Sequence, residues 1–186
     1  MMSNPRTSPF PTPRKDAAMR RYFGIAVAAC GVDLLTKAIA VRSLGETGLV
    51  PLTERLSLTL VWNTGTAAGV SIGPYTWLLN VVVTVLALGL VITVVRAMAS
   101  VDARAVVALG LVSGGALGNL ASIVAGPRGV ADFFAVRLTD DLTMVANVAD
   151  LFLWAGALAL APVGATLLHM TREARVAVRP ADVEME

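Results

Sequence analysis

Five polar residues stand out in a strongly apolar chain, because their types suit acid–base chemistry. They are two carboxylates and three amides: Asp132, Asp150, Asn63, Asn119 and Asn147. Two carboxylates in a poorly hydrated site do not both ionise easily, so one of them keeps a proton. The ionised partner can take a proton from a water that attacks a peptide carbonyl, while the protonated partner donates to the carbonyl oxygen. Neighbouring amides can polarise that carbonyl, so the set predicts aspartic proteolysis if the fold brings it together.

A further pair of charged residues, Asp33 and Lys37, lies four positions apart inside an apolar run. Residues at i and i+4 share a helix face, so the two can form an ion pair. A charge at the centre of a bilayer costs about 2.5–3.5 kcal/mol on insertion scales, so its presence needs a reason. Two interpretations stay open: the pair lets the helix insert, or it braces a neighbouring site. Both can hold at once.

The composition indicates which elements must position these residues. Hydrophobic residues make up 56% of the 186 residues and charged residues 15%, whereas soluble domains have about 45–50% and 25%. The excess is gathered in four runs, at residues 22–41, 75–95, 103–125 and 142–168. Each is near the roughly 20 residues that span a bilayer, and backbone groups in lipid must pair within their own segment. We therefore predict an all-α integral membrane protein with four transmembrane helices.

The loop between the first two spans, over residues 42–74, carries its own pattern. Leucines alternate through Leu56, Leu58 and Leu60, which predicts a short strand. The Gly-, Thr- and Ala-rich run over 63–73 predicts a tight turn or a re-entrant piece. We expect a small extracytoplasmic β/loop element between helices 1 and 2.

The ends of the chain differ from its middle. Residues 1–21 are proline-rich and basic, and we predict a disordered cytoplasmic tail there; residues 170–186 form a polar cytoplasmic tail. The four-helix membrane domain then covers 22–169. A lipoprotein leader is the competing interpretation of residues 14–30, but the apolar run continues past Cys30 without a polar linker.

The basic residues predict the orientation. Ten of the 15 lysines and arginines fall in the two tails and in the loop between the second and third spans. The positive-inside rule then puts both termini in the cytoplasm and the acid–base residues on the extracytoplasmic side. The net charge of +2 reflects this topology, so we expect no nucleic-acid partner. One histidine and one cysteine exclude a His/Cys metal cage and a disulfide scaffold, and we expect no metal.

Five short motifs follow one another along residues 20–170. They are Asp33-Leu34-Leu35-Thr36-Lys37, Asn63-Thr64-Gly65-Thr66-Ala67-Ala68-Gly69, Gly114-Gly115-Ala116-Leu117-Gly118-Asn119, Val130-Ala131-Asp132-Phe133 and Asn147-Val148-Ala149-Asp150. In this order they resemble D-x-x-x-K, N-T-G-A-A-F-G, G-G-A-x-G-N, V-V-D-F and F-N-x-A-D of signal peptidase II, the bacterial lipoprotein signal peptidase family. Each motif alone is weak evidence, whereas five in family order on a four-span chain make a specific resemblance.

The resemblance implies a membrane-embedded aspartic endopeptidase of the bacterial cytoplasmic membrane. Its substrate would be a diacylglyceryl-modified prolipoprotein, cut just before the lipid-modified cysteine and held in contact with membrane lipid. No metal or organic cofactor is implied, and we expect a monomer. The family's catalytic pair falls on Asp132 and Asp150, its substrate-binding amides on Asn63 and Asn119, to which we add Asn147, and its structural polar pair on Asp33 and Lys37.

One position departs from the family pattern. Where the family has G-N-x-x-D-R, this chain has Ser122 and Ile123 in place of the acid and the arginine. The alternative function is therefore a pseudoenzyme or an altered-specificity binder of lipidated signal peptides. A small transporter is a third interpretation, disfavoured because transport places polar groups along a path near the midplane, whereas these gather at one face.

Overall fold

Four long helices dominate the structure, a computed structural model that describes residues 13–45, 48–64, 72–126 and 128–177. They are α1 (Pro13–Leu44), α2 (Thr76–Val101), α3 (Arg104–Ala125) and α4 (Val148–Ala177), with a short 3-10 helix η1 (Gly73–Tyr75) before α2. Within this part of the chain, all four are long and apolar enough to cross a membrane. The prediction of an all-α membrane protein with four spans is confirmed.

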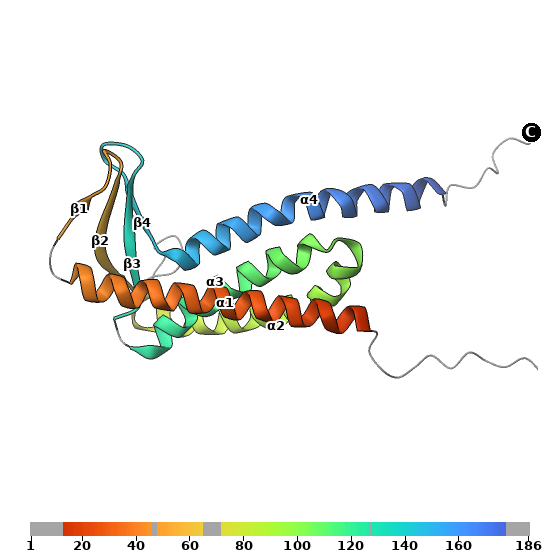
Figure 1. The fold of residues 1–186 in the computed structure, drawn as a ribbon, viewed down its shortest axis with the longest axis horizontal. Coiled ribbons are helices and arrows are strands. Elements are labelled where there is room, and N and C mark those ends of the chain that lie inside the picture. The colour runs from red at the N-terminus through yellow and green to blue at the C-terminus, as the bar shows by residue number, and fades with distance from the viewer. Residues whose placement is uncertain (1–12, 46–47, 65–71, 127, 178–186) are drawn as a thin grey trace, which may run out of the picture.

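A four-stranded antiparallel sheet lies at one end of the helices (Figure 1). Its order is β1 (Val50–Pro51), β2 (Leu56–Asn63), β3 (Val130–Arg137) and β4 (Thr143–Ala146). The start of α1 and the end of α4 lie at the opposite end of the molecule (Figure 1). The predicted strand is confirmed as β2, but half of the sheet comes from the segment between α3 and α4.

The predicted start of the fourth span is wrong by six residues. Residues 142–147 are apolar enough to extend the run, yet Met144 and Val145 lie opposite Val136 and Ala135 in the β3–β4 pair. Backbone pairing with a neighbouring strand satisfies these groups as well as a helix would. The fourth helix therefore begins only at Val148.

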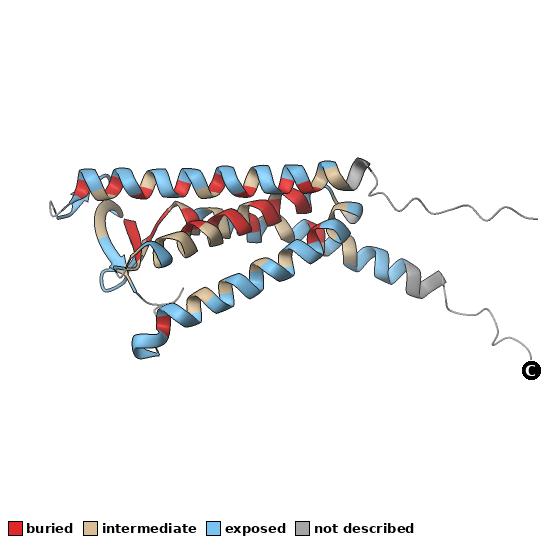
Figure 2. Ribbon diagram, turned by 90° about the horizontal axis from the view of Figure 1, so that it is seen from below, coloured by how far each residue is buried: buried red, intermediate tan, exposed pale blue. Residues whose placement is uncertain are grey.

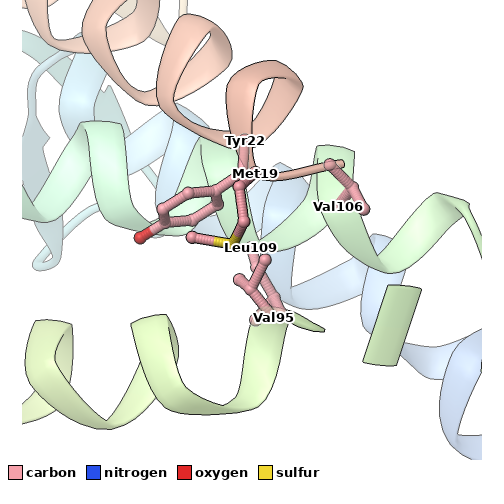
Figure 3. Packing of buried hydrophobic residues seen from close by; sticks show 5 residues of the cluster. All are labelled: Met19, Tyr22, Val95, Val106 and Leu109. Carbon is pink, nitrogen blue, oxygen red and sulfur yellow. The ribbon is translucent and has the colours of Figure 1, made fainter. Parts of the chain in front are cut away.

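The first helix begins earlier than the sequence predicts. Residues 13–21, assigned to a disordered tail, continue α1. Their order has a packing reason, because Met19 and Tyr22 are buried against Val95 of α2 and against Val106 and Leu109 of α3 (Figure 3). These contacts with α2 and α3 hold the first turns of α1 against the bundle.

Helix α3 lies at the centre of the bundle, and small residues let its neighbours approach. A Cβ atom on Gly114 would lie 2.5 Å from Cβ of Ala29 in α1, and one on Gly156 would lie 2.6 Å from the Ala108 carbonyl oxygen. Such close crossings are typical of small residues between membrane helices. Buried residues follow one face of α1 and much of α3, while α2 and α4 are mostly exposed (Figure 2). Those exposed apolar surfaces suit contact with lipid tails.

The sheet is fixed to the bundle by a second apolar cluster. Ala40 and Leu44 at the end of α1 pack with Phe133 of β3, and Leu58 and Leu60 of β2 cover them. The cluster holds β2 and β3 across the end of α1. It therefore positions the last residue of β2 and the middle of β3 beside the ends of the helices, where the predicted polar residues lie.

Candidate active site

Asp132 lies in the middle of β3, opposite Val61 of β2, and only 2% of its surface is exposed. Both of its carboxylate oxygens accept hydrogen bonds from amides. Asn63 Nδ2, at the end of β2, donates to Oδ2 at 3.1 Å, and Asn147 Nδ2 donates to Oδ1 at 2.5 Å. The carboxylate is thus held between the sheet and the start of α4.

Asp150 lies in the first turn of α4, where Asn147 precedes the helix. The two form a reciprocal pair, because the Asn147 backbone N–H donates to Asp150 Oδ2 at 3.0 Å and the Asp150 N–H donates to Asn147 Oδ1 at 3.2 Å. This arrangement is a capping box built from Asn and Asp. Asn147 therefore caps the helix, orients Asp150 and also contacts Asp132.

Lys37 links α1 to α3 beneath the two carboxylates. Its Nζ donates to Asp33 Oδ2 and to Asn119 Oδ1, both at 2.7 Å. Asn119 Nδ2 in turn donates to Asp150 Oδ1 at 3.1 Å. A chain of hydrogen bonds therefore connects polar side chains of α1 and α3 to the Asp150 carboxylate of α4.

Asp33 does more than neutralise Lys37. Its second oxygen, Oδ1, accepts a hydrogen bond of 2.8 Å from the backbone N–H of Ala149, one of the open donors at the start of α4. Asp33 is fully buried and Lys37 is 5% exposed. A side chain on Gly118 of α3 would collide with the Asp33 carboxylate, so glycine is required there. The pair therefore contacts both Asn119 of α3 and the backbone at the start of α4.

The structure brings all seven predicted polar residues into one connected network. It runs from Asp33 through Lys37 and Asn119 to Asp150, and from there through Asn147 to Asp132 and Asn63. The sequence motifs contained the residue types but not the hydrogen bonds. The capping role of Asn147 was missed, although Asn three positions before Asp, ahead of an apolar run, is a capping signature.

The surroundings of Asp132 favour its protonated form. Burial raises the pKa of the Asp132 carboxyl above its usual range, and the nearby negative charge of Asp150 adds to this. Hydrogen bonds from Asn147 and Asn63 oppose the rise but do not cancel it.

A cavity of about 620 Å³ adjoins the network at Asn63. Thr76 and Trp77 at the start of α2 form one wall, and Ile123 and Val124 near the end of α3 form another. Gly129 lies next to Asn63 and has a positive φ of 84°, a conformation that favours glycine. A side chain at this position would collide with the Asn63 carbonyl. A substrate segment in this cavity would lie beside Asn63 and hence near Asp132.

Three further points concern the segment after β2, the position of Ser122 and metal binding. Residues 65–69 of the second motif, and most of the turn or re-entrant piece predicted over 63–73, lie outside the described residues. Ser122 of α3 donates its hydroxyl to the Gly118 carbonyl at 3.0 Å. Among the described residues, no group of three or more His, Cys, Asp or Glu is placed to hold a metal ion.

The structure combines four helices that could span a membrane with a carboxylate–amide network at one end, and the comparison with known families gives the class of protein. The family model of signal peptidase (SPase) II matches residues 25–164, and the chain belongs to this family. The family consists of multi-pass proteases of the bacterial inner membrane. The resemblance seen in the motifs is therefore confirmed.

Relatives and solved structures agree with this assignment. The lipoprotein signal peptidase of Mycobacterium avium (strain 104) is 33% identical over 166 residues, which cover 86% of this chain and 87% of the relative. That of Bifidobacterium longum (strain DJO10A) is 37% identical over 131 residues, 69% of each chain. A bacterial membrane enzyme solved by the in meso method at 1.9 Å has the same fold, with a TM-score of 0.64 and 24% identity over 78% of this chain and 90% of its own.

Proposed function

We propose that this protein is a lipoprotein signal peptidase that uses Asp132 and Asp150 as an aspartic catalytic pair. The observation that carries the proposal is the bridge made by Asn147, which donates its side-chain amide to one carboxylate and its backbone N–H to the other. A bridge of this kind holds the two acids at one site. The relatives that carry the name lipoprotein signal peptidase support the same activity.

The two carboxyl groups have separate roles in the proposed reaction. Asp132, whose pKa is raised by burial, carries the proton and donates it to the oxygen of the scissile carbonyl. Asp150, at the start of α4, acts as the base that takes a proton from the attacking water, so that a tetrahedral diol forms. Asp150 then gives its proton to the leaving amine while Asp132 takes a proton back from one hydroxyl of the diol, so that the C–N bond breaks, a carboxylic acid is released and both acids return to their starting states. Each transfer uses only these groups and water.

The proposed substrate is a diacylglyceryl-modified prolipoprotein, cut before its lipid-modified cysteine. The cavity beside Asn63 has apolar walls from Trp77, Ile123 and Val124, which suits a signal helix that arrives from the membrane. Asn63 and Asn119 would hold the peptide backbone next to the acids, and Asn147 would keep both acids oriented. The protein would act as a monomer in contact with membrane lipid.

The proposed orientation puts both termini in the cytoplasm and the sheet, with the acid pair, on the extracytoplasmic side. The support is the excess of basic residues in the tails and in the loop between α2 and α3, together with the position of the sheet at the opposite end (Figure 1). A reporter active only in the cytoplasm should work when fused after Glu186 and be silent at Gly48 or Asp140. Activity at Gly48 would contradict the orientation.

The deciding experiment is cleavage of a diacylglyceryl-modified prolipoprotein by the purified protein in detergent. The product should begin at the lipid-modified cysteine by mass spectrometry, and the same prolipoprotein without lipid should be a poor substrate. Asp132→Asn and Asp150→Asn should each lower the rate by at least about 10²–10⁴-fold, because each removes one proton-transfer role. Asp140→Asn, an exposed carboxylate in the loop after β3, is the matched control and should cleave normally.

A pseudoenzyme that binds lipidated signal peptides without cutting them is the second candidate. The observation that favours it is at Ser122, whose hydroxyl donates its hydrogen bond to the Gly118 carbonyl. This position therefore offers a substrate neither the acid nor the arginine of the family pattern. This candidate predicts saturable binding of the lipidated substrate with no product. Retention of both acids in one network supports the protease instead.

A further inference from the structure

A second cavity, of about 480 Å³, lies where α1, α3 and the β2–β3 pair meet. Val41 and Arg42 come from α1, Ala125 from the end of α3, Trp62 from β2, and Arg128 from the segment that leads into β3. Two glycines border both this cavity and the one beside Asn63, so the two are neighbours. The second cavity has no part in the proposed reaction.

The charge around this cavity is of one sign. Among the described residues that line it, three are basic, Lys37, Arg42 and Arg128, and none is a carboxylate. Lys37 is neutralised by its ion pair with Asp33. Neither arginine belongs to an ion pair within the described part of the chain. Two uncompensated guanidinium groups therefore flank one pocket.

Trp62 holds one of these guanidinium groups at the pocket. The Cζ atom of Arg128 lies over the Trp62 ring, 5.5 Å from the ring centroid, which is within the range of a cation–π contact. Arg42 lies in the last turn of α1, so it approaches the same cavity from the helix side.

The cavity lies at the ends of two candidate membrane spans, where a helix that crosses a bilayer meets the phospholipid headgroups. Its two helical walls are the final turns of α1, which ends at Leu44, and of α3, which ends at Ala125, and both helices are candidate spans. Tryptophan is typical of this interfacial level, and arginine side chains near helix ends extend to it. Ala38 and Val41 give the cavity an apolar wall within the candidate span of α1.

We propose that this cavity binds an anionic phospholipid of the leaflet on the side of the sheet. Its phosphodiester would lie between Arg42 and Arg128, because a guanidinium gives two parallel hydrogen bonds to a phosphate. Its glycerol and upper acyl chains would lie along Val41 and Ala125. An anionic headgroup is favoured over a zwitterionic one, since a headgroup ammonium would face the same two arginines.

The lipid fits these features better than an acidic peptide does. Carboxylates would also satisfy the two arginines, but a soluble peptide gains nothing from walls that lie at the ends of membrane helices. The proposal is independent of proteolysis, because it requires neither acid of the candidate active site. It assigns a role to Arg128 and Trp62, which the reaction does not use.

The test is native mass spectrometry of the full-length protein, released from nanodiscs that contain equal amounts of phosphatidylglycerol and phosphatidylcholine. The wild type should retain one phosphatidylglycerol in preference to phosphatidylcholine. The double variant Arg42→Gln with Arg128→Gln should lose this preference by about 25-fold, because each basic residue near an anionic lipid contributes roughly a fivefold factor. Arg55→Gln, an exposed arginine before β2 that lines a different cavity, is the matched control and should bind as the wild type does.

Several outcomes would overturn the proposal. Equal retention of the two lipids by the wild type would do so, and so would an unchanged preference in a double variant that unfolds at the wild-type temperature. A double variant that does not fold leaves Trp62→Leu as the deciding change, which removes the stacking surface of Arg128 and should weaken lipid retention. Displacement of the bound lipid by inorganic phosphate or by a soluble acidic peptide at equal concentration would assign the pocket to those ligands instead.

Discussion

The ammonium of Lys37 fixes the orientation of the Asn119 side-chain amide. Lysine can only donate hydrogen bonds, so the amide atom that lies 2.7 Å from Lys37 Nζ must be the oxygen. The amide nitrogen then faces Asp150, to which it donates at 3.1 Å. Lys37 is thus connected to the Asp150 carboxylate through the Asn119 side chain, without a direct contact between the two charged groups.

Lys37→Met should lower the stability of the protein in detergent. Met has a similar length but no charge, so Asp33 keeps only the hydrogen bond from Ala149 N–H. An orphaned buried charge costs about 3–5 kcal/mol in soluble proteins, and proton uptake by Asp33 would reduce that cost. The measurement is the thermal unfolding temperature.

The control for this prediction is the double variant Lys37→Met with Asp33→Asn. It removes both charges, and the new amide oxygen can still accept from Ala149, so it should be more stable than the single variant. A single variant that unfolds at the wild-type temperature would show that Asp33 has another partner or is solvated.

The raised pKa of Asp132 predicts a pH dependence of stability. The folded protein holds this proton above the pH at which an unfolded Asp, with a pKa of about 3.9, releases it. In that window the folded state binds more protons than the unfolded state, so the free energy of unfolding falls as pH rises. Because burial is the main cause of the shift, Asp132→Asn should flatten this part of the curve.

The measurement is the unfolding temperature of the wild type and Asp132→Asn from pH 3.5 upward. Asp140→Asn, the exposed control, should keep the wild-type slope. Parallel curves for the wild type and Asp132→Asn would mean that Asp132 has no raised pKa in the folded protein.

Much of the fold could be predicted from the sequence, because membrane spans are set by local composition. Helices α2 and α3 begin within one residue of the predicted spans. The errors occur where contacts between residues far apart in the sequence determine the secondary structure. The strands β2 and β3 are some 70 residues apart in the chain and pair through a bulge between Leu58 and Val61, which no local pattern contains.

In the candidate active site, too, the sequence predicts the residues but not the contacts between them. The acid and amide residues could be found because polar groups in apolar surroundings are costly and therefore conspicuous. Their connections could not, because each hydrogen bond joins different elements: Lys37 of α1 reaches Asn119 of α3, and Asn63 of β2 reaches Asp132 of β3. The contact between Asp33 and the Ala149 backbone has no signature in either residue type.

Gly118→Ala should disturb the site from the side of α3. The added Cβ would collide with the Asp33 carboxylate, so the ion pair with Lys37 must shift, and with it the orientation of Asn119. We expect a lower unfolding temperature and slower cleavage. Gly89→Ala in α2 is the matched control, since a Cβ there meets nothing within 4 Å and alanine is the better helix former by about 0.8–1.0 kcal/mol. Equal losses in both variants would contradict a specific role for Gly118.

The last prediction concerns the position where this chain departs from its family. Ile123 lines the cavity beside Asn63, whereas Ser122 lines the neighbouring one and donates to Gly118. An arginine at 123 would bring a guanidinium to the substrate cavity, where it could give two hydrogen bonds to peptide carbonyls. An aspartate at 122 would restore the acid of the family pattern on the side of the neighbouring cavity, which Lys37 also lines. We therefore expect Ser122→Asp combined with Ile123→Arg to raise the cleavage rate of a standard lipidated substrate.

Each single change should help less than the double change. Ser122→Asp alone adds a third carboxylate near the acid pair, and Ile123→Arg alone puts an unpaired charge against apolar walls. The measurement is the initial rate for the wild type, both single variants and the double variant on one lipidated substrate. A fast wild type that the double change does not improve would show that apolar burial already holds the signal helix. A wild type without activity that the double change restores would identify the natural chain as a binder with an intact but unused acid pair.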